Sequence, residues 1–335
     1  MFTACKFVVI YINIELLRVY QVAHFKKGEI LANLKNNYRV NQLHIAFYIK
    51  SLYELMKPRV MSLVLFTSMV GLLIAPEKVS FTVSIISLFA VALGAGAAGA
   101  LNMWYESDLD ALMSRTCLRP IPTGKLQKNQ ALWFGTILSL ISISLLYVTA
   151  NLVSSILLAI TIGFYFFIYT IWLKRRTSQN IVIGGAAGAL PPVIGWAIST
   201  NSVSIESFIL FLIIFIWTPS HFWALSLYKS SDYKKAKIPM LPVTAGIKKT
   251  KLNILIYSLL LAPIVALPYF FNFGSLIYLT LSSLMTFYYI YLCTLLFKEK
   301  NNKTSNIIAR KIFVYSIFYL FFIFVLILAD NVIQR

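Results

Sequence analysis

The chain has 335 residues, of which 59% are hydrophobic and only 12% are charged, and its mean hydropathy is +0.78. A soluble domain of this length cannot bury so much apolar surface, so the composition excludes an ordinary soluble protein and indicates an integral membrane protein. The formal net charge of +19 would suit a nucleic-acid partner, but the lysines and arginines lie in short segments between apolar runs, where they report topology instead. We therefore expect no nucleic-acid partner. The three cysteines, Cys5, Cys117 and Cys293, lie far apart and predict neither a disulfide framework nor a zinc site.

Residues 1–50 precede the first long apolar run. Residues 7–17 are apolar, but the stretch is short, contains Glu15 and lacks a small-residue cleavage site, so no signal peptide is predicted. The segment is not rich in Ser and Arg and also contains Glu29, which argues against a mitochondrial transit peptide. It is either an interfacial amphipathic helix or a cytoplasmic N-terminal extension that the function can dispense with. We favour the second interpretation.

The rest of the chain, residues 51–335, is predicted to be one polytopic domain. Its apolar runs are long and uninterrupted, so they indicate an all-α membrane bundle and not the alternating strands of a barrel. We expect nine transmembrane helices, at about residues 60–76, 80–102, 131–149, 152–173, 180–198, 207–227, 252–270, 274–297 and 311–329.

The distribution of basic residues predicts how these spans are oriented. The segment before the first span holds nine Lys and Arg, and the four loops expected on the same side hold four, three, seven and five. These make 28 of the 30 basic residues, and only Lys78 and Arg335 fall on the other side. The positive-inside rule therefore predicts a cytoplasmic N-terminus and an outside C-terminus. A miscounted span would have scrambled this asymmetry, so it also supports the count of nine.

Residues 94–99, in the second span, read GAGAAG and match the pattern GxGxxG. A dinucleotide fingerprint requires a preceding strand and a following soluble helix, and neither is predicted here. Close helix packing through small residues is the better interpretation, and it applies equally to residues 184–188 in the fifth span. The same small residues would let a bulky ligand approach the backbone.

The segment that follows the second span, residues 102–122, reads NMWYESDLDALMSRTCLRPIP. Asn102, Glu106 and Asp110 lie four residues apart, so on a helix they stack along one face. Acids at the end of a membrane span are costly, and their usual justification is functional. Two carboxylates and an amide oxygen suit a hard divalent cation.

The same loop carries Arg115 and Arg119, which are expected on the following turns and suit a phosphate. The alternative is a solvated helix end with scattered acids. Against it, the loop holds three of the eleven acids of the chain. The third acid, Asp108, points off the shared face and is expected to pair with a loop lysine.

Basic residues also follow the fourth span, where Lys174, Arg175 and Arg176 lie in a row. They are either ordinary topogenic charge or part of a phosphate-binding site, and the sequence does not decide between the two.

A second candidate region, residues 221–242, begins near the inner end of the sixth span. Asp232 lies one helical turn beyond Tyr228, so both can face the same side. Its alternative role is an ion pair with Lys234 or Lys235. His221 is either a hydrogen-bonded core residue or a ligand, because a buried titratable group in a membrane is costly.

Two acidic patches at the inner ends of different spans, flanked by basic residues, suit a magnesium-bridged diphosphate. The metal would neutralise a departing pyrophosphate and act as a Lewis acid. An intramembrane cavity would hold a long isoprenoid tail, and its aromatic rings could stabilise an allylic cation.

At these residues the chain resembles the UbiA superfamily of membrane prenyltransferases and, within it, the branch that acts on haem. The resemblance rests on residues 55–60, 102–122, 179–196 and 221–242 and extends from about residue 52 to the end. It implies a helical bundle around a central cavity, in the bacterial inner membrane. It also implies that farnesyl diphosphate is ionised with Mg²⁺, that a vinyl group of haem B captures the cation, and that water completes haem O.

The resemblance also assigns roles to residues. It implies that the catalytic residues are Asn102, Glu106, Asp110 and Asp232, the last three being metal ligands. It implies that the substrates are bound by Arg115, Arg119, Lys174, Tyr228, Lys229 and His221, with the histidine in contact with haem. Many bacterial members carry aspartate where this chain has Glu106, so the metal geometry is expected to shift. Partners expected on this basis are the lipid bilayer and either a haem A synthase or oxidase assembly factors.

Two other functions remain open at this point. One is a prenyltransferase that acts on an aromatic or quinone-precursor acceptor. The other is a transporter, which predicts acids near the middle of spans and an internal repeat, whereas the acids here cluster at inner span ends.

Overall fold

The structure is a computed structural model that describes residues 45–334, and the residues before and after lie outside this description. It divides into two units at residue 50, and the unit Ser51–Arg335 contains the helices discussed below except the start of the segment Ile45–Leu55. No strand occurs within the described range, so the predicted all-α fold is confirmed. The role predicted for residues 1–50 falls almost entirely outside the described residues and stays a prediction.

The described residues contain eight helices long and apolar enough to cross a membrane, or nine if the bent pair Ile45–Leu55 and Pro58–Ile74 counts as one span. This agrees with the predicted count. The long helices and their parts are α3 (Pro58–Ile74), α4 (Phe81–Tyr105), α6 (Lys128–Thr149), α7 (Leu152–Gly163), η1 (Phe164–Leu173), α8 (Asn180–Ala189), α9 (Pro191–Thr200), α10 (Ile205–Tyr228), α13 (Gly246–Phe270), α14 (Leu276–Lys298) and α15 (Asn302–Gln334). Three short helices lie in the loops: α5 (Ser107–Leu112), α11 (Ser230–Lys235) and α12 (Leu241–Thr244).

Two of the predicted spans are interrupted. The fourth continues from α7 into the π-helix η1, in which Thr170 Oγ1 donates to the carbonyl of Tyr165 at 2.8 Å. The fifth breaks between α8 and α9 at Leu190, because Pro191 and Pro192 lack the amide protons that would continue the ladder and disfavour helix in the preceding residue.

The last helix differs from its prediction in length. It begins at Asn302, although the span was expected from residue 311. Hydropathy marks the apolar part of a helix and not its ends, so the first nine residues of α15, which include Lys303 and Arg310, belong to the predicted loop. The apolar part coincides with the prediction.

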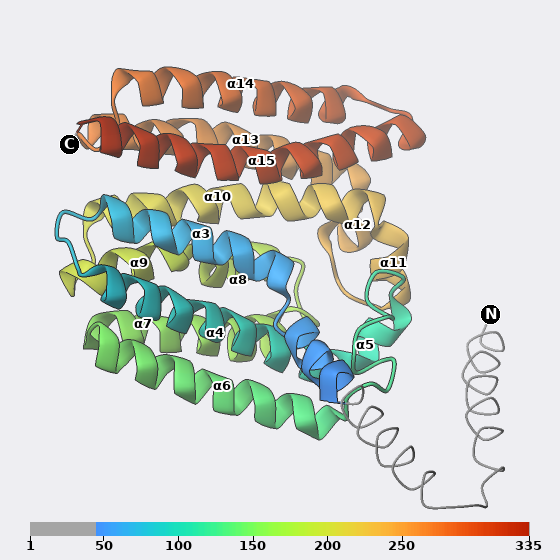
Figure 1. The fold of residues 1–335 in the computed structure, drawn as a ribbon. Helices are drawn as coiled ribbons and strands as arrows, with labels where there is room; N and C mark the ends of the chain where they lie inside the picture. The colour runs from blue at the N-terminus through green and yellow to red at the C-terminus, as the bar shows by residue number, and fades with distance from the viewer. Residues whose placement is uncertain (1–44, 335) are drawn as a thin grey trace, which may run out of the picture. The chain divides into compact units, whose positions relative to one another are not determined.

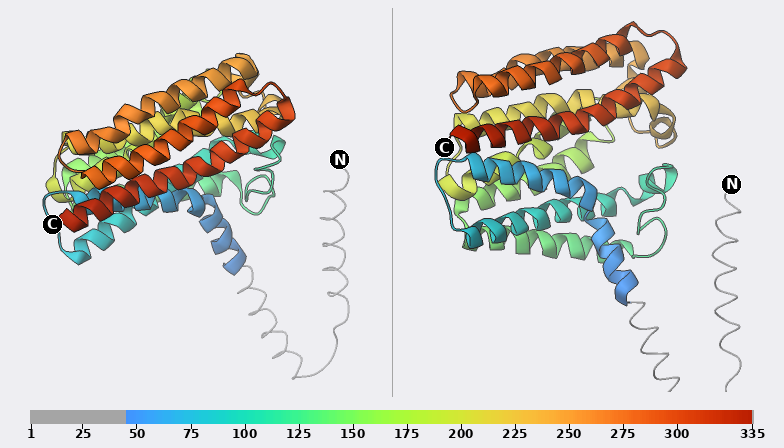
Figure 2. Two further views of the ribbon diagram at one scale, coloured as in Figure 1. Left: turned by 90° about the horizontal axis from the view of Figure 1, so that it is seen from above. Right: turned by 45° about the horizontal axis from the view of Figure 1, so that its top comes forward.

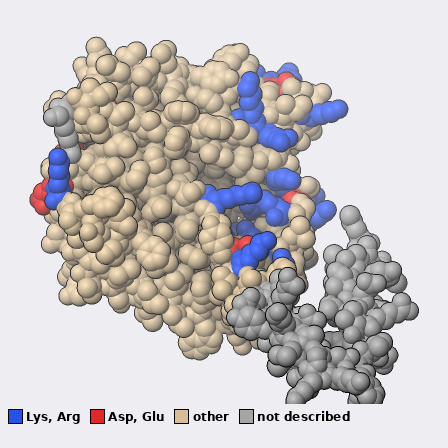
Figure 3. Space-filling view, in the orientation of Figure 1, with Lys and Arg blue, Asp and Glu red and all other residues tan. Residues whose placement is uncertain are grey.

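The helices of the Ser51–Arg335 unit run roughly side by side (Figures 1 and 2). The packed pairs join distant parts of the chain: α3 lies against α9, α4 against α6, and α10 against both α13 and α15. The short helices α5, α11 and α12 gather at one end of the bundle, and the C-terminus lies at the other (Figure 1). Lysines and arginines are also concentrated at the end that carries the short helices (Figure 3).

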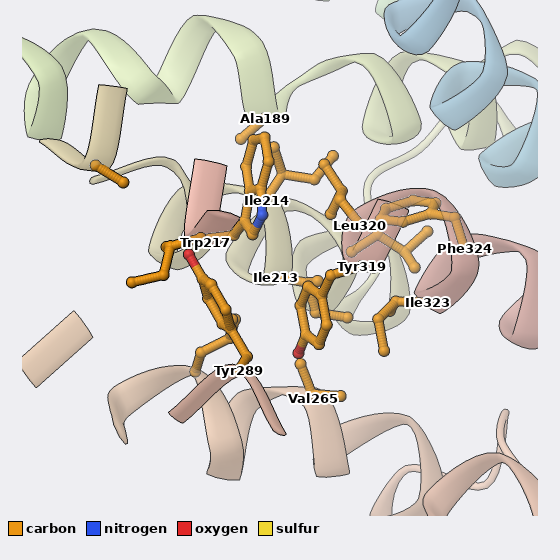
Figure 4. Packing of buried hydrophobic residues seen from close by; sticks show 14 of the residues in the cluster. Ala189, Ile213, Ile214, Trp217, Val265, Tyr289, Tyr319, Leu320, Ile323 and Phe324 are labelled. Atoms are coloured by element: carbon orange, nitrogen blue, oxygen red, sulfur yellow. The ribbon is translucent and has the colours of Figure 1, made fainter. Parts of the chain in front are cut away.

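The larger hydrophobic core lies between α10 and the three C-terminal helices (Figure 4). Several of its polar atoms are paired internally, as is favoured where no water is available, although the Trp223 indole nitrogen has no partner. The Tyr278 hydroxyl donates to the carbonyl of Val265 at 2.8 Å, and the Trp217 indole donates to the carbonyl of Ser316 at 3.0 Å.

Glycines allow several of these helices to approach closely. A Cβ atom on Gly71 would overlap the backbone carbonyl of Pro192, and one on Gly195 would overlap that of Ser68, so α3 and α9 touch through their backbones. Gly94 and Gly96 lie against the side chains of Leu158 and Met56. The interpretation of residues 94–99 as a packing motif is therefore confirmed.

Candidate functional site

Asn102, Glu106 and Asp110 lie on one continuous stretch of helical hydrogen bonds. The helix α4 ends at Tyr105 and α5 begins at Ser107, but Glu106 N–H donates to the carbonyl of Asn102 and Asp110 N–H donates to that of Glu106. The predicted stacking of the three side chains along one face therefore survives the break. All three are buried, with exposures of 2%, 2% and 3%.

Each of these buried side chains holds a cation that comes from elsewhere in the chain. Lys174 Nζ lies 2.5 Å from Glu106 Oε2. Arg119 Nη1 donates to both carboxylate oxygens of Asp110 at 2.8 Å. Lys57 Nζ donates to Asn102 Oδ1 at 2.5 Å. Three basic side chains thus converge on the face predicted to bind a metal and a diphosphate.

The path of the chain after Asp110 differs from the prediction. The helix α5 ends at Leu112, and Met113 is extended, so Arg115 and Arg119 are not on further helical turns. A series of tight turns instead brings Arg119 back to Asp110, helped by a hydrogen bond from Thr116 Oγ1 to the Asp110 carbonyl at 3.0 Å. Arg115 is exposed and forms no ion pair with any residue from 45 to 334.

Lys57 is a site residue that the sequence pattern did not single out. It has a left-handed conformation, with φ of 54°, and it lies between the helical segment that ends at Leu55 and Pro58, the first residue of α3. This sharp change of direction points its side chain at Asn102. Burial, reinforced by the positive charge of Arg119, lowers the pKa of Lys57 to about 7.

Lys174 owes its position to the π-helix. The wide turn of η1 ends at Leu173, and Lys174 Nζ lies 5.7 Å from the centre of the Tyr169 ring. The hydroxyl of Thr170, on the same segment, accepts a hydrogen bond from Asn102 Nδ2 at 3.0 Å. Lys174 therefore lies in the candidate site through its contact with Glu106, and its role in phosphate binding stays a prediction.

Asp108 and Arg175 form an ion pair on the rim of the site. Arg175 donates to both oxygens of Asp108, at 2.8 and 3.1 Å, and its guanidinium lies 5.0 Å from the centre of the Tyr105 ring. Partial burial opposes ionisation of Asp108, but the hydrogen bonds from Arg175 outweigh it, so the pKa of this carboxyl is lowered. The expected loop partner of Asp108 was a lysine, and it is instead Arg175.

The second acidic region meets the first. Asp232, on α11, accepts a hydrogen bond from Ser114 Oγ at 2.7 Å and is 8% exposed. It forms no ion pair with Lys234 or Lys235. The two loops also share a hydrophobic cluster, in which Leu109 and Met113 pack with residues of the second region. Two loops whose contacting residues are 118 positions apart in sequence therefore meet at this end of the bundle.

Two of the remaining predicted residues, His221 and Tyr228, contact α15. Tyr228 packs edge-on against Phe313, with ring centres 6.1 Å apart, and Lys229 is partly exposed. His221 is stacked between Trp217 and Phe313 at 4.3 and 4.6 Å, and its Nδ1 is 2.6 Å from Ser316 Oγ. Because Ser316 donates its single proton to the Phe313 carbonyl, Nδ1 is the donor to Ser316, and Nε2 carries the lone pair of the neutral ring. His221 thus has the contacts of a core residue, and its contact with haem stays a prediction.

The acidic residues fit a divalent cation in one specific respect. Glu106 Oε1 is buried and has no hydrogen-bond partner, although the other oxygen of the same carboxylate is paired. An ionised oxygen left bare in this way is the kind of ligand that Mg²⁺ prefers. Within the part of the chain that the structure describes, however, no three His, Cys, Asp or Glu side chains cluster as a ready-made metal site. The metal role of Glu106, Asp110 and Asp232 is therefore still a prediction.

Comparison with known proteins places the chain in a family. The UbiA prenyltransferase family matches residues 64–327. The chain belongs to the UbiA prenyltransferase family. The protein named Protoheme IX farnesyltransferase of Pelagibacter ubique is 62% identical over 304 residues, which are 91% of this chain and all of that one. The Parvibaculum lavamentivorans protein of the same name is 49% identical over 284 residues, covering 85% of this chain and 89% of its own length.

Solved structures share the fold. A structure of a digeranylgeranylglyceryl phosphate synthase superposes with a TM-score of 0.71 at 20% identity, over 85% of this chain and 99% of that one. A UbiA homologue from Archaeoglobus fulgidus, bound to GPP and Mg²⁺, superposes with a TM-score of 0.61 at 16% identity, over 83% and 99%. At these identities the likeness establishes the helical bundle, and the membership of the family rests on the sequence matches.

Proposed function

We propose that the protein transfers the farnesyl group of farnesyl diphosphate to a vinyl group of haem B and, with addition of water, forms haem O. The observation that carries the diphosphate half of this proposal is the hydrogen bond from Ser114 to Asp232, because it joins the two acidic loops over one end of the bundle. The acceptor is supported by the relatives named Protoheme IX farnesyltransferase, at up to 62% identity over almost the whole chain.

The charges of the site match a magnesium diphosphate. The carboxylates of Glu106 and Asp110 now face the cations of Lys174 and Arg119. A magnesium diphosphate would offer its metal ion to the two carboxylates and its anionic oxygens to Lys174 and Arg119. All four side chains would then keep partners of opposite charge. A neighbour of the same fold contains GPP and Mg²⁺, which supports this pairing.

In the proposed reaction, Glu106, Asp110 and Asp232 hold the metal, and Lys174, Arg119 and Arg115 hold the diphosphate. Mg²⁺, when bound, would supply charge neutralisation and Lewis acidity to the leaving group. The bond between the farnesyl carbon and the diphosphate oxygen breaks, and the electron pair leaves with the diphosphate. The allylic cation then forms a bond to the terminal vinyl carbon of haem. Water adds to the neighbouring carbon and releases a proton.

The remaining expectations belong to the same proposal. The protein would lie in the bacterial inner membrane with a cytoplasmic N-terminus and an outside C-terminus, and the diphosphate would be bound at the cytoplasmic end. The basic residues gathered at that end of the bundle support this orientation (Figure 3). His221 would contact haem, and Tyr228 and Lys229, in the second acidic region with Asp232, would bind substrate. A haem A synthase or oxidase assembly factors would receive the product.

The alternative acceptor is an aromatic quinone precursor, and one assay separates the two. Membranes that contain the protein are given farnesyl diphosphate with Mg²⁺ and either haem B or the aromatic acid, and products are identified by mass. We expect the haem alone to gain a farnesyl group and a hydroxyl. Chelation of the metal should stop the conversion, and added Mg²⁺ should restore it. Unchanged haem together with a prenylated aromatic acid would show that the acceptor is wrong.

A further inference from the structure

Asn180 is a buried polar residue that the functions assigned above do not use. It is the first residue of α8, it has no exposed surface, and its Oδ1 has no hydrogen-bond partner. Only three other buried side-chain polar atoms between residues 45 and 334 lack a partner: Ser68 Oγ, Trp223 Nε1 and Glu106 Oε1. Of these four residues, only Asn180 and Glu106 have an unpaired atom that can accept a hydrogen bond but not donate one.

The orientation of the Asn180 amide is fixed by its other contact. Its Nδ2 donates to the backbone carbonyl of Thr177 at 2.6 Å. If the amide were turned over, its oxygen would face this carbonyl, and two acceptors would meet with no proton between them. The oxygen is therefore the atom without a partner. A buried acceptor left in this state is destabilising, and an apolar side chain of similar size would not carry that cost.

The surroundings of Asn180 belong to the candidate site. One turn along α8, Gly184 packs against the ring of Tyr169, whose centre lies 5.7 Å from Lys174 Nζ. The next residue, Ile181, packs in the hydrophobic cluster formed by the two acidic loops. The segment that leads into α8 begins at Lys174, which holds Glu106. Asn180 therefore lies at the end of the bundle where the two acidic loops and their carboxylates meet.

The chemistry of the proposed substrate limits what this oxygen can bind. A farnesyl diphosphate at neutral pH offers anionic oxygens and hydrocarbon, and neither can donate to an amide oxygen. A divalent cation can instead be coordinated by the lone pair of this oxygen, since amide and carboxylate oxygens are both hard ligands for Mg²⁺. We propose that Asn180 Oδ1 and Glu106 Oε1 together bind the divalent cation that accompanies the diphosphate, an inference that rests on the proposed function. The helix α8 would then supply a metal ligand in addition to those of the two acidic loops.

The test measures metal binding directly. Mn²⁺ affinity is determined by electron paramagnetic resonance on the purified protein with an unreactive thio-analogue of farnesyl diphosphate, alongside the thermal midpoint. We expect Asn180→Leu to weaken Mn²⁺ binding by about tenfold or more. The thermal midpoint should stay close to that of the wild type, because the variant removes a buried unpaired oxygen and, with it, the hydrogen bond from Nδ2 to Thr177. Asn180→Asp should retain Mn²⁺. The matched control is Ser68→Ala, which removes another unpartnered buried atom and should leave Mn²⁺ affinity as it is.

Two results would overturn this inference. The first is an Asn180→Leu protein that binds Mn²⁺ as tightly as the wild type. The second is an Asn180→Leu protein in which Mn²⁺ affinity and the thermal midpoint fall together, which would make Asn180 a structural residue. The proposed function fails separately, if the wild-type protein binds Mn²⁺ and the analogue but leaves haem B unchanged with farnesyl diphosphate and Mg²⁺.

Discussion

Three neighbouring carboxylates differ in role because they differ in surroundings. The side chains of Glu106 and Asp110 are 3% and 4% exposed and face cations inside the bundle, whereas the side chain of Asp108 is 58% exposed and pairs with Arg175 on the rim. An exposed pair of this kind contributes about 1 kcal/mol or less to stability, so Asp108 provides a nearby carboxylate for comparison. The spacing of four residues in the sequence correctly separates the buried carboxylates, Glu106 and Asp110, from the exposed one, Asp108.

The buried pair of Lys174 and Glu106 makes a prediction about stability. Lys174→Met would leave the Glu106 carboxylate buried without its cation, and removing one partner of a buried pair typically costs about 3–5 kcal/mol. We therefore expect a clearly lower thermal midpoint for this variant in detergent. The double variant Lys174→Met with Glu106→Gln should recover most of the loss, because no charge remains to be compensated. A double variant no more stable than Lys174→Met would show that the pair is not the source of the effect.

Lys57 predicts how stability changes with pH. Its pKa is about 7 in the folded protein and 10.5 as the usual value, so between these pH values the unfolded chain binds more protons. Stability should therefore rise with pH across this window, and the full cost of the buried charge should be present below pH 7. Lys57→Met removes the titration. The thermal midpoint of the variant minus that of the wild type should shrink from pH 7 to pH 9, and a constant difference would contradict this account.

At the scale of helices, backbone contact between α3 and α9 fixes the first half of the bundle. The glycines of this contact meet carbonyl groups and not flexible side chains, so the neighbour cannot move aside. The break before Pro191 makes the contact possible, because it lets α9 follow α3 independently of α8. The interrupted fifth span thus serves packing through α9 as well as the candidate site at the start of α8.

This contact predicts the effect of adding a single methyl group. Gly71→Ala and Gly195→Ala should each destabilise the protein by about 3 kcal/mol or more, since overpacking against a fixed backbone is not relieved by rotamer changes. The matched control is Gly188→Ala, also on a helix of the fifth span, where a Cβ meets nothing within 4 Å. Yield and thermal midpoint of the three purified variants provide the measurement. Equal midpoints for all three would contradict the close approach of α3 and α9.

At the scale of the whole molecule, the asymmetry of charge predicts which end faces the cytoplasm. Cys117 lies in the loop of the first acidic region, and Lys78 lies between α3 and α4 at the other end. In a protein without Cys5 and Cys293, we expect an impermeant maleimide to label Cys117 only when the cytoplasmic face is accessible. Lys78→Cys, in a background without Cys117, should be labelled only from the opposite face. The reverse pattern would invert the predicted topology.

The sequence predicted the helical spans well because hydropathy acts along the chain, and most boundaries agree to within a few residues. It also located Asn102, Glu106 and Asp110, because their spacing is a local helical property. It did not identify Lys57, Ser114 or Asn180. The roles of the first two depend on contacts between segments 45 and 118 residues apart, and Asn180 is recognised only by the partner that its oxygen lacks. The π-turn that positions Lys174 has no pattern in the sequence either.

One comparison tests most directly whether the buried acidic face performs the proposed reaction. Wild type, Glu106→Gln and Asp108→Asn are inserted in membranes at equal amounts, and conversion of haem B with farnesyl diphosphate and Mg²⁺ is followed by mass spectrometry. We expect wild type and Asp108→Asn to form the farnesylated, hydrated haem at similar rates. Glu106→Gln should be slower by at least about 100-fold, because a lost metal ligand removes several kcal/mol of charge stabilisation. Near-normal conversion by Glu106→Gln, or equal loss in both variants, would contradict the account.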